Sequence, residues 1–150
     1  MRRWWLNVWM VGGLIAACAG APDGTPVPEP TWDPGPAGPG DAARGADLYQ
    51  QTLLGEANAP GCITCHSLDP ETVLVGPAMP GVTARAATLL ASAAYTGTAQ
   101  TAEEYLRESI MAPEIYLVPN FPAEGMYGHY EHTLKAQEIE DLVAYLLTLP

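Results

Sequence analysis

The run Cys62-Ile63-Thr64-Cys65-His66 limits what this chain can fold into more than any other feature of its sequence. Two cysteines three residues apart project from one face of a helical turn, so both sulfurs can reach the same partner. The imidazole of His66 follows directly and can ligate whatever the sulfurs hold. This spacing is the attachment signature of c-type haem, in which the cysteines form thioethers and the histidine ligates the iron. The motif therefore predicts one covalent haem c on Cys62 and Cys65, with His66 as an iron ligand.

Three other interpretations of the motif compete with haem attachment. A thioredoxin-like redox pair would need a neighbouring βαβ pattern, which the sequence lacks. A structural zinc site would need four ligands, and His129 and His132 could supply the second pair. A disulfide between residues three apart would constrain very little of the chain. The cysteine count favours haem, because the third cysteine, Cys18, belongs to a different signal.

The N-terminal segment is typical of an exported protein. Two arginines precede the mostly apolar residues 4–17, which is the pattern of a secretory signal peptide. The apolar stretch is short for a membrane span, which needs about 20 residues. Ile-Ala-Ala before Cys18 resembles a bacterial lipobox, so we expect a lipoprotein signal peptide over 1–17 and a lipid on Cys18. A plain signal peptide and a retained short anchor are the alternatives. Either way the protein is predicted to be extracytoplasmic, at the periplasmic or outer face of a membrane.

A proline-rich segment follows the predicted signal. Residues 21–40 contain seven prolines and four glycines. Proline removes backbone donors and glycine raises the entropic cost of ordering, so this stretch favours neither helix nor sheet. Its composition is typical of a semi-rigid spacer. We therefore predict a lipid-anchored linker over 18–40 and a single domain over 41–150.

The charge of the chain excludes one class of partner. Only four basic residues follow Cys18, against 17 acidic ones, which gives that part a formal charge of −13. Such a surface cannot neutralise phosphates, so nucleic acid is not an expected partner. Lys135 is the only lysine, so no ring of lysines can surround the haem. We expect a partner surface that is neutral or basic, or a largely apolar contact at the haem edge.

Helical signals dominate residues 41–150, and strand signals are poor. Thr101 and Glu104 form a capping box, and Asp41 can cap the first helix. In the last helix the apolar side chains recur at helical spacing, which places Glu138, Glu140 and Asp141 on its outer face. The expected elements are helices over 42–53, 85–94, 101–111 and from Ile139 to Leu149, a helical turn at 62–67, and a loop over 113–128.

These features together resemble the class I monohaem cytochromes c. Gly45 and Tyr49 are similar to the family's glycine and aromatic pair on the first helix, and residues 76–81 (Gly-Pro-Ala-Met-Pro-Gly) are similar to its post-haem loop. Residues 105–113 and 142–147 look like cytochrome c domains of respiratory membrane complexes, such as alternative complex III or cytochrome oxidase. The resemblance implies an all-α class I cytochrome c fold, with four to five helices around one haem. It also implies that Gly45 and Tyr49 cross the last helix at Leu142 and Tyr145.

The resemblance also implies roles around the iron. The carbonyl of Pro77 is expected to accept a hydrogen bond from His66, and Met126 is at the family position of the sixth ligand. Glycines flank Met126 and let the backbone approach a flat group. The chain departs from the family pattern at Met79, where leucine is usual, and at Tyr127, where proline is usual. The other candidates for the sixth ligand are Met79, Met111, His129 and His132.

The function implied by this resemblance is one-electron transfer. The sequence contains no distal Arg/His constellation of the kind that haem catalysis needs, so we expect an electron carrier and not an enzyme. Its expected partners are a quinol-oxidising complex or terminal oxidase, of which it could be a subunit, and a soluble electron carrier. The alternatives are a haem-based sensor of small ligands and a haem subunit of a periplasmic dehydrogenase.

Overall fold

The computed structural model describes residue 33 and residues 35–150 of the chain. The predicted signal peptide over 1–17, Cys18 and most of the predicted linker lie outside the described residues. In the part that is described, no helix combines the length and the apolar character that crossing a membrane requires.

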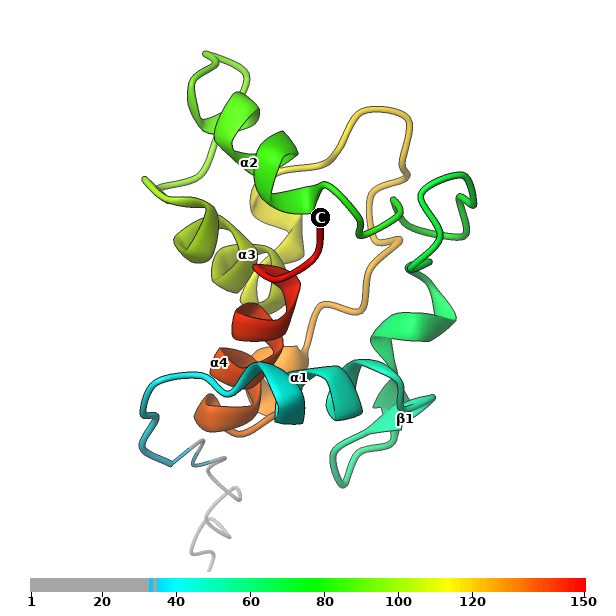
Figure 1. Cartoon of the computed structure of the whole chain (residues 1–150), viewed down its shortest axis with the longest axis vertical. Coiled ribbons are helices and arrows are strands. Elements are labelled where there is room, and N and C mark those ends of the chain that lie inside the picture. Colours follow the sequence, from blue (N-terminus) through cyan, green and yellow to red (C-terminus); the bar gives the residue numbers. More distant parts are fainter. Residues whose placement is uncertain (1–32, 34) are drawn as a thin grey trace, which may run out of the picture. The chain divides into compact units, whose positions relative to one another are not determined.

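The described part is mainly helical, as predicted (Figure 1). It adds one small hairpin that the sequence did not signal. In chain order its elements are α1 (Ala42–Tyr49), β1 (Leu53–Leu54), β2 (Ala59–Pro60), the 3-10 turn η1 (Cys62–Thr64), α2 (Val82–Leu90), α3 (Ala102–Met111), the 3-10 turns η2 (Pro113–Ile115) and η3 (Tyr130–His132), and α4 (Ala136–Leu146).

Helix α1 begins where it was predicted but ends earlier. The side chain of Asp41 accepts hydrogen bonds from the backbone N–H groups of Ala43 and Arg44, at 2.9 and 3.2 Å, and so caps the helix. The prediction of helix to residue 53 was wrong, because the chain turns into the antiparallel pair β1–β2. Gly55 adopts a φ of +63° in that turn, which glycine tolerates, and Leu54 is fully buried in the hairpin.

Helices α1 and α4 cross in close contact, as the resemblance implied (Figure 1). A Cβ on Gly45 would lie 1.9 Å from the carbonyl oxygen of Asp141, so only glycine permits this approach. Close by, the rings of Tyr49 and Tyr145 pack with their centroids 5.4 Å apart. Leu142 is also fully buried in the core.

Asp141 does not lie on the outside of α4, which corrects the prediction from helical periodicity. It is 2% exposed. Its carboxylate accepts hydrogen bonds from Arg44 Nε at 2.7 Å, from the backbone N–H of Asp41 at 2.8 Å and from Gln137 Nε2 at 2.9 Å. The periodicity argument assumed one buried face, whereas α1 covers a second face of α4. Glu140 remains partly exposed and pairs with Arg107 at 2.6 Å.

Helices α2 and α3 complete the fold around the site. α3 has the predicted capping box: Thr101 Oγ1 accepts from the N–H of Glu104 at 3.1 Å, and the Glu104 carboxylate accepts from the N–H of Thr101 at 3.2 Å. α2 begins three residues before the predicted start, because Gly81 turns the chain in the left-handed region at φ +74°. It ends at Leu90, four residues before the predicted end. Residues 113–128 form an irregular loop, as predicted, apart from the 3-10 turn η2.

Candidate functional site

The cysteine motif forms a tight turn directly after the hairpin. η1 begins at Cys62, and the backbone N–H groups of Cys65 and His66 both donate to the carbonyl of Cys62, at 3.1 and 2.9 Å. Both cysteines are free thiols and partly buried. Burial raises the pKa of the Cys62 thiol to about 11, so this group is uncharged at neutral pH. The turn therefore presents two free thiols, and no disulfide joins them as the disulfide alternative requires.

His66 is held in one orientation by its neighbours. Its Nδ1 lies 2.9 Å from the carbonyl oxygen of Pro77, the contact that the resemblance implied. A carbonyl can only accept, so Nδ1 donates and Nε2 keeps its lone pair. Burial lowers the pKa of His66, and the Pro77 hydrogen bond only partly opposes this, so the ring is neutral. A neutral imidazole with a free nitrogen is the form that binds a metal ion.

Two further residues support His66, and the sequence reasoning missed both roles. A Cβ on Gly76 would lie 2.3 Å from Cε1 of the imidazole, so the glycine makes room for the ring. Tyr49 donates its hydroxyl to the carbonyl of His66 at 2.7 Å. The sequence had indicated Tyr49 only as a partner of the last helix. The position of Tyr49 in the sequence does not reveal this hydrogen bond, because the bond depends on how the hairpin folds back.

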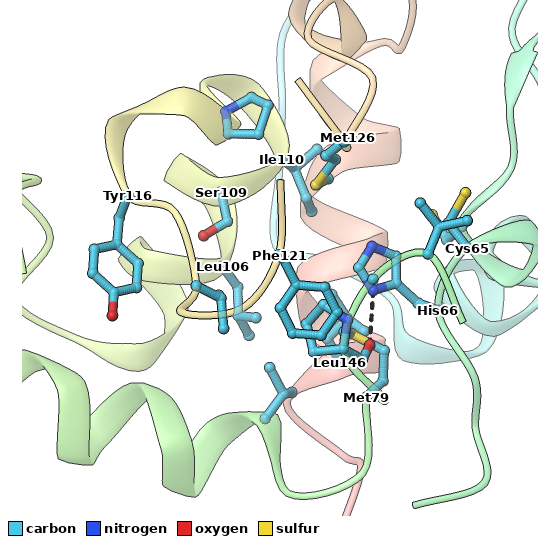
Figure 2. Close-up of a pocket in the computed structure, with 18 of the residues that line it drawn as sticks. Cys65, His66, Met79, Leu106, Ser109, Ile110, Tyr116, Phe121, Met126 and Leu146 are labelled. Atoms are coloured by element: carbon cyan, nitrogen blue, oxygen red, sulfur yellow. Dashed lines mark hydrogen bonds between the residues drawn. The ribbon is translucent and has the colours of Figure 1, made fainter. Parts of the chain in front are cut away.

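A large apolar cavity opens beside His66. Its lining is mostly apolar and includes Cys62, Cys65 and His66, which is the composition expected of a cofactor pocket. One wall is the buried face of α3, another is the loop after η2, and α4 contributes Leu142 and Leu146. Figure 2 shows Phe121, Leu106, Ile110 and Tyr116 around this space. The capping box predicted the start of α3, but not that one face of this helix would line a cavity.

Some of the candidates for the sixth ligand line the cavity and others lie outside it. Met79 and Met126 line it, whereas Met111, His129 and His132 do not. Met79 is buried and donates its backbone N–H to the carbonyl of Ser67 at 2.9 Å, within the loop that carries Pro77. In Figure 2, His66 lies between the two methionines, with its Pro77 hydrogen bond on the Met79 side and its other ring nitrogen toward Met126.

The residues present fit a covalently attached haem. Two free thiols, one oriented neutral imidazole and apolar walls are the groups that such a cofactor uses. When bound, haem supplies one-electron redox chemistry.

The geometry is unfavourable to the two other interpretations of the motif. Within the described residues, no three or more His, Cys, Asp or Glu side chains group together as a metal site, so His129 and His132 do not complete a zinc site with the cysteines. Among the described residues the only strands are the two-residue strands β1 and β2. They do not form the βαβ unit that a thioredoxin-like redox pair would need.

Comparison with protein families gives a match over most of the chain. The family model described as "Cytochrome c" matches residues 42–150. No curated protein matches the chain. The match covers the helices, the cysteine motif and the loop with Met126.

Proposed function

Since the chain belongs to the cytochrome c family, we propose that it is a membrane-anchored electron carrier, or a haem subunit of a respiratory or photosynthetic electron-transfer complex. The family and the Cys62–Cys65 pair together establish covalently bound haem c and haem-based electron transfer. Cytochrome c domains are typically non-catalytic carriers and are usually extracytoplasmic, which agrees with the signal peptide predicted over 1–17.

The observation that carries the proposal is the pair of side chains on the two sides of the cavity. His66 offers a free ring nitrogen, and Met126 lines the same cavity from a distant part of the chain. Met79 is the other methionine in the cavity, but its backbone is fixed in the loop that supports His66. We therefore propose that Met126 would be the second protein ligand of the haem iron. A sulfur in that position closes the site to small ligands and leaves outer-sphere electron transfer as its function.

The axial assignment is tested by replacing the sulfur. In the ferric protein we expect the weak sulfur-to-iron charge-transfer band in the near-red, and Met126→Ala should abolish it. Met111→Ala is the matched control, because Met111 is also partly buried but lies outside the cavity. Carbon monoxide should bind to reduced Met126→Ala and not to the unaltered protein. A band that persists in Met126→Ala would reject the ligand, and carbon monoxide binding to the unaltered protein would favour a sensor.

The membrane attachment is proposed through a lipid on Cys18. A single acyl chain holds a protein only marginally, whereas two or more hold it firmly, so a diacylglyceryl cysteine should resist washing with salt. Mass spectrometry of the mature N-terminus tests this point. A mature chain that begins after Cys18 without a lipid would exclude the anchor and leave the electron-transfer function standing.

The proposed partners follow from redox chemistry and charge. A quinol-oxidising complex or a terminal oxidase, alone or through a soluble carrier, would exchange electrons with the haem. The strongly acidic chain favours a partner surface that is basic or neutral.

A further inference from the structure

Three tyrosines contact one another at the wall of the cavity. Tyr105 and Tyr116 line the cavity, whereas Tyr95 does not. The ring of Tyr95 packs edge-on against both of the others, with its centroid 5.9 Å from each of theirs. In Figure 2, Tyr116 lies on the opposite side of the cavity from His66. These three rings, which we call the tyrosine cluster, therefore connect the cavity wall to Tyr95.

The hydroxyl of Tyr95 is held between an acceptor and a donor. It donates to the carboxylate of Glu108 on α3 and accepts from the backbone N–H of Ala99 at 3.1 Å. The other carboxylate oxygen of Glu108 accepts from the N–H and from the hydroxyl of Thr98, each at 3.0 Å. A Cβ on Gly97 would overlap both the Tyr95 hydroxyl and the Glu108 carboxylate, so the glycine leaves the space in which they meet. The surrounding chain therefore fixes this tyrosine and this carboxylate as a pair.

Among the described residues, no other tyrosine hydroxyl donates to a carboxylate. Tyr49 and Tyr130, for example, donate to backbone carbonyls. A carbonyl does not hold a proton near neutral pH, whereas a carboxylate becomes a stable carboxylic acid when it takes one up. Burial opposes the charge of Glu108, but the hydrogen bonds from Tyr95 and Thr98 outweigh it and lower the pKa of this carboxyl. Glu108 is therefore ionised at neutral pH and can accept a proton.

The acceptor decides which tyrosine of the cluster loses an electron most easily. A neutral phenol holds its proton up to about pH 10, but it becomes a strong acid once an electron is removed. Oxidation is therefore favoured where a base in hydrogen-bond contact takes the proton in the same step. An oxidising equivalent that enters the cluster at Tyr105 or Tyr116 is thus expected to end at Tyr95.

We propose that Tyr95 and Glu108 form a redox site that donates an electron when hydrogen peroxide oxidises the cofactor, and so protects the haem from damage. The proposal rests on the electron-carrier function above. Hydrogen peroxide takes up two electrons, together with two protons from the solvent, and forms two water molecules. The reduced iron supplies one electron and becomes ferric. Tyr95 supplies the other through the tyrosine cluster, while its hydroxyl proton moves to Glu108, which leaves a neutral tyrosyl radical and a protonated carboxyl group.

The carrier function restores this site. One electron from the donor of the carrier returns to the Tyr95 radical, Glu108 gives back the proton, and a second electron reduces the iron. The proposed Met126 ligand hinders the access of peroxide to the iron, so we expect slow protection and not rapid enzymatic turnover.

The test uses the full-length protein with its haem, reduced with ascorbate and freed of the excess. After mixing with hydrogen peroxide and rapid freezing, electron paramagnetic resonance should show a tyrosyl radical. Its signal should narrow when the protein is made with ring-deuterated tyrosine. Tyr95→Phe removes the hydroxyl and Glu108→Gln removes the base, so each should abolish the signal. Haem loss under peroxide, followed by the Soret absorbance, should become about twofold faster or more in both variants, which is the effect if Tyr95 intercepts at least half of the oxidising equivalents.

Tyr145→Phe is the matched control. Tyr145 packs on the cavity-lining Tyr49, with the ring centroids 5.4 Å apart, much as Tyr95 packs on its two neighbours. The described part offers its hydroxyl no carboxylate comparable to Glu108, so Tyr145→Phe should keep both the radical and the rate of haem loss. Ferricyanide, a one-electron oxidant too weak to oxidise tyrosine, should oxidise every variant at the same rate and so shows that each one is folded and redox-active.

The outcomes separate this proposal from the proposed function. A radical that persists in Tyr95→Phe or in Glu108→Gln would overturn the redox site, and so would the absence of a radical from the unaltered protein. Equal rates of haem loss in Tyr95→Phe and Tyr145→Phe would overturn the protective role. In each of these cases, oxidation by ferricyanide would leave the carrier function standing. If ferricyanide does not oxidise the unaltered protein, the carrier function itself fails, and the Tyr95 site fails with it.

Discussion

The imidazole of His66 sits in a space that one missing side chain creates. Gly76 passes so close to the ring that a Cβ would overlap its Cε1 atom. We predict that Gly76→Ala pushes the ring away from the Pro77 carbonyl and lowers the free energy of unfolding by about 1–3 kcal/mol, the usual cost of overpacking. The ferric absorption spectrum should change with it, because the ring that we propose as an iron ligand would turn.

Gly128→Ala is the control for this substitution. No atom lies within 4 Å of a Cβ at Gly128, so the same added methyl group should meet nothing there. Denaturant unfolding and the ferric spectrum measure both variants. Equal effects of the two substitutions would show that Gly76 does not shape the histidine site.

Asp141 makes the stability of the domain depend on pH. Hydrogen bonds from Arg44 are the main reason that the pKa of the buried carboxyl falls from its ordinary value of 3.8 to about 2. A carboxyl whose pKa is lower in the folded state stabilises the fold above its unfolded pKa, and that stability is lost as pH falls toward about 2. We predict that Asp141→Asn costs about 2 kcal/mol at pH 7 and almost nothing near pH 2.

Unfolding by urea at several pH values checks this prediction. Asp47→Asn on the exposed side of α1 should change stability by less than about 0.5 kcal/mol at every pH. A cost of Asp141→Asn that stays constant from pH 7 to pH 2 would contradict the ionic role of this carboxylate.

At the scale of elements, the crossing of α1 and α4 depends on Gly45. Alanine is the better helix former by about 1 kcal/mol, so propensity alone predicts that Gly45→Ala stabilises α1. We expect the opposite, a loss of at least about 2 kcal/mol, because the new Cβ would overlap the Asp141 carbonyl and force the helices apart. Gly38→Ala meets only the end of the Gln137 side chain, at 3.4 Å, and should be nearly neutral in the same thermal unfolding experiment. A Gly45→Ala variant that is more stable would show that the crossing tolerates a wider spacing.

At the scale of the whole molecule, the cofactor is part of the core. The helices α3 and α4 and the loop with Met126 face one another across the cavity, and few side chains fill the space between them. We predict that the double variant Cys62→Ala, Cys65→Ala, prepared without haem, melts at least about 10 °C below the haem-bound protein. Its near-ultraviolet circular dichroism should also weaken, because the tyrosines around the cavity lose their fixed environment. An equal melting temperature would mean that the domain is stable without its cofactor.

Much of the site could be predicted from residues that are close together in the sequence. The Cys62–His66 motif, the Asp41 cap and the capping box of Thr101 and Glu104 each depend on groups within four positions of one another. Their geometry follows from the local backbone, which the sequence specifies directly.

The tertiary structure decided what depends on distant parts of the chain. Asp141 is buried because α1, about 100 residues away, covers the face that helical periodicity assigned to solvent. Long-range packing also separates Met111 from Met126. Met126 lines the cavity, whereas Met111 does not. The exposure of Val73 and Leu74 was likewise not predictable, because an aliphatic run indicates burial until the fold shows that nothing covers it. Local rules fix which groups a segment offers, whereas long-range packing fixes which of those groups meet.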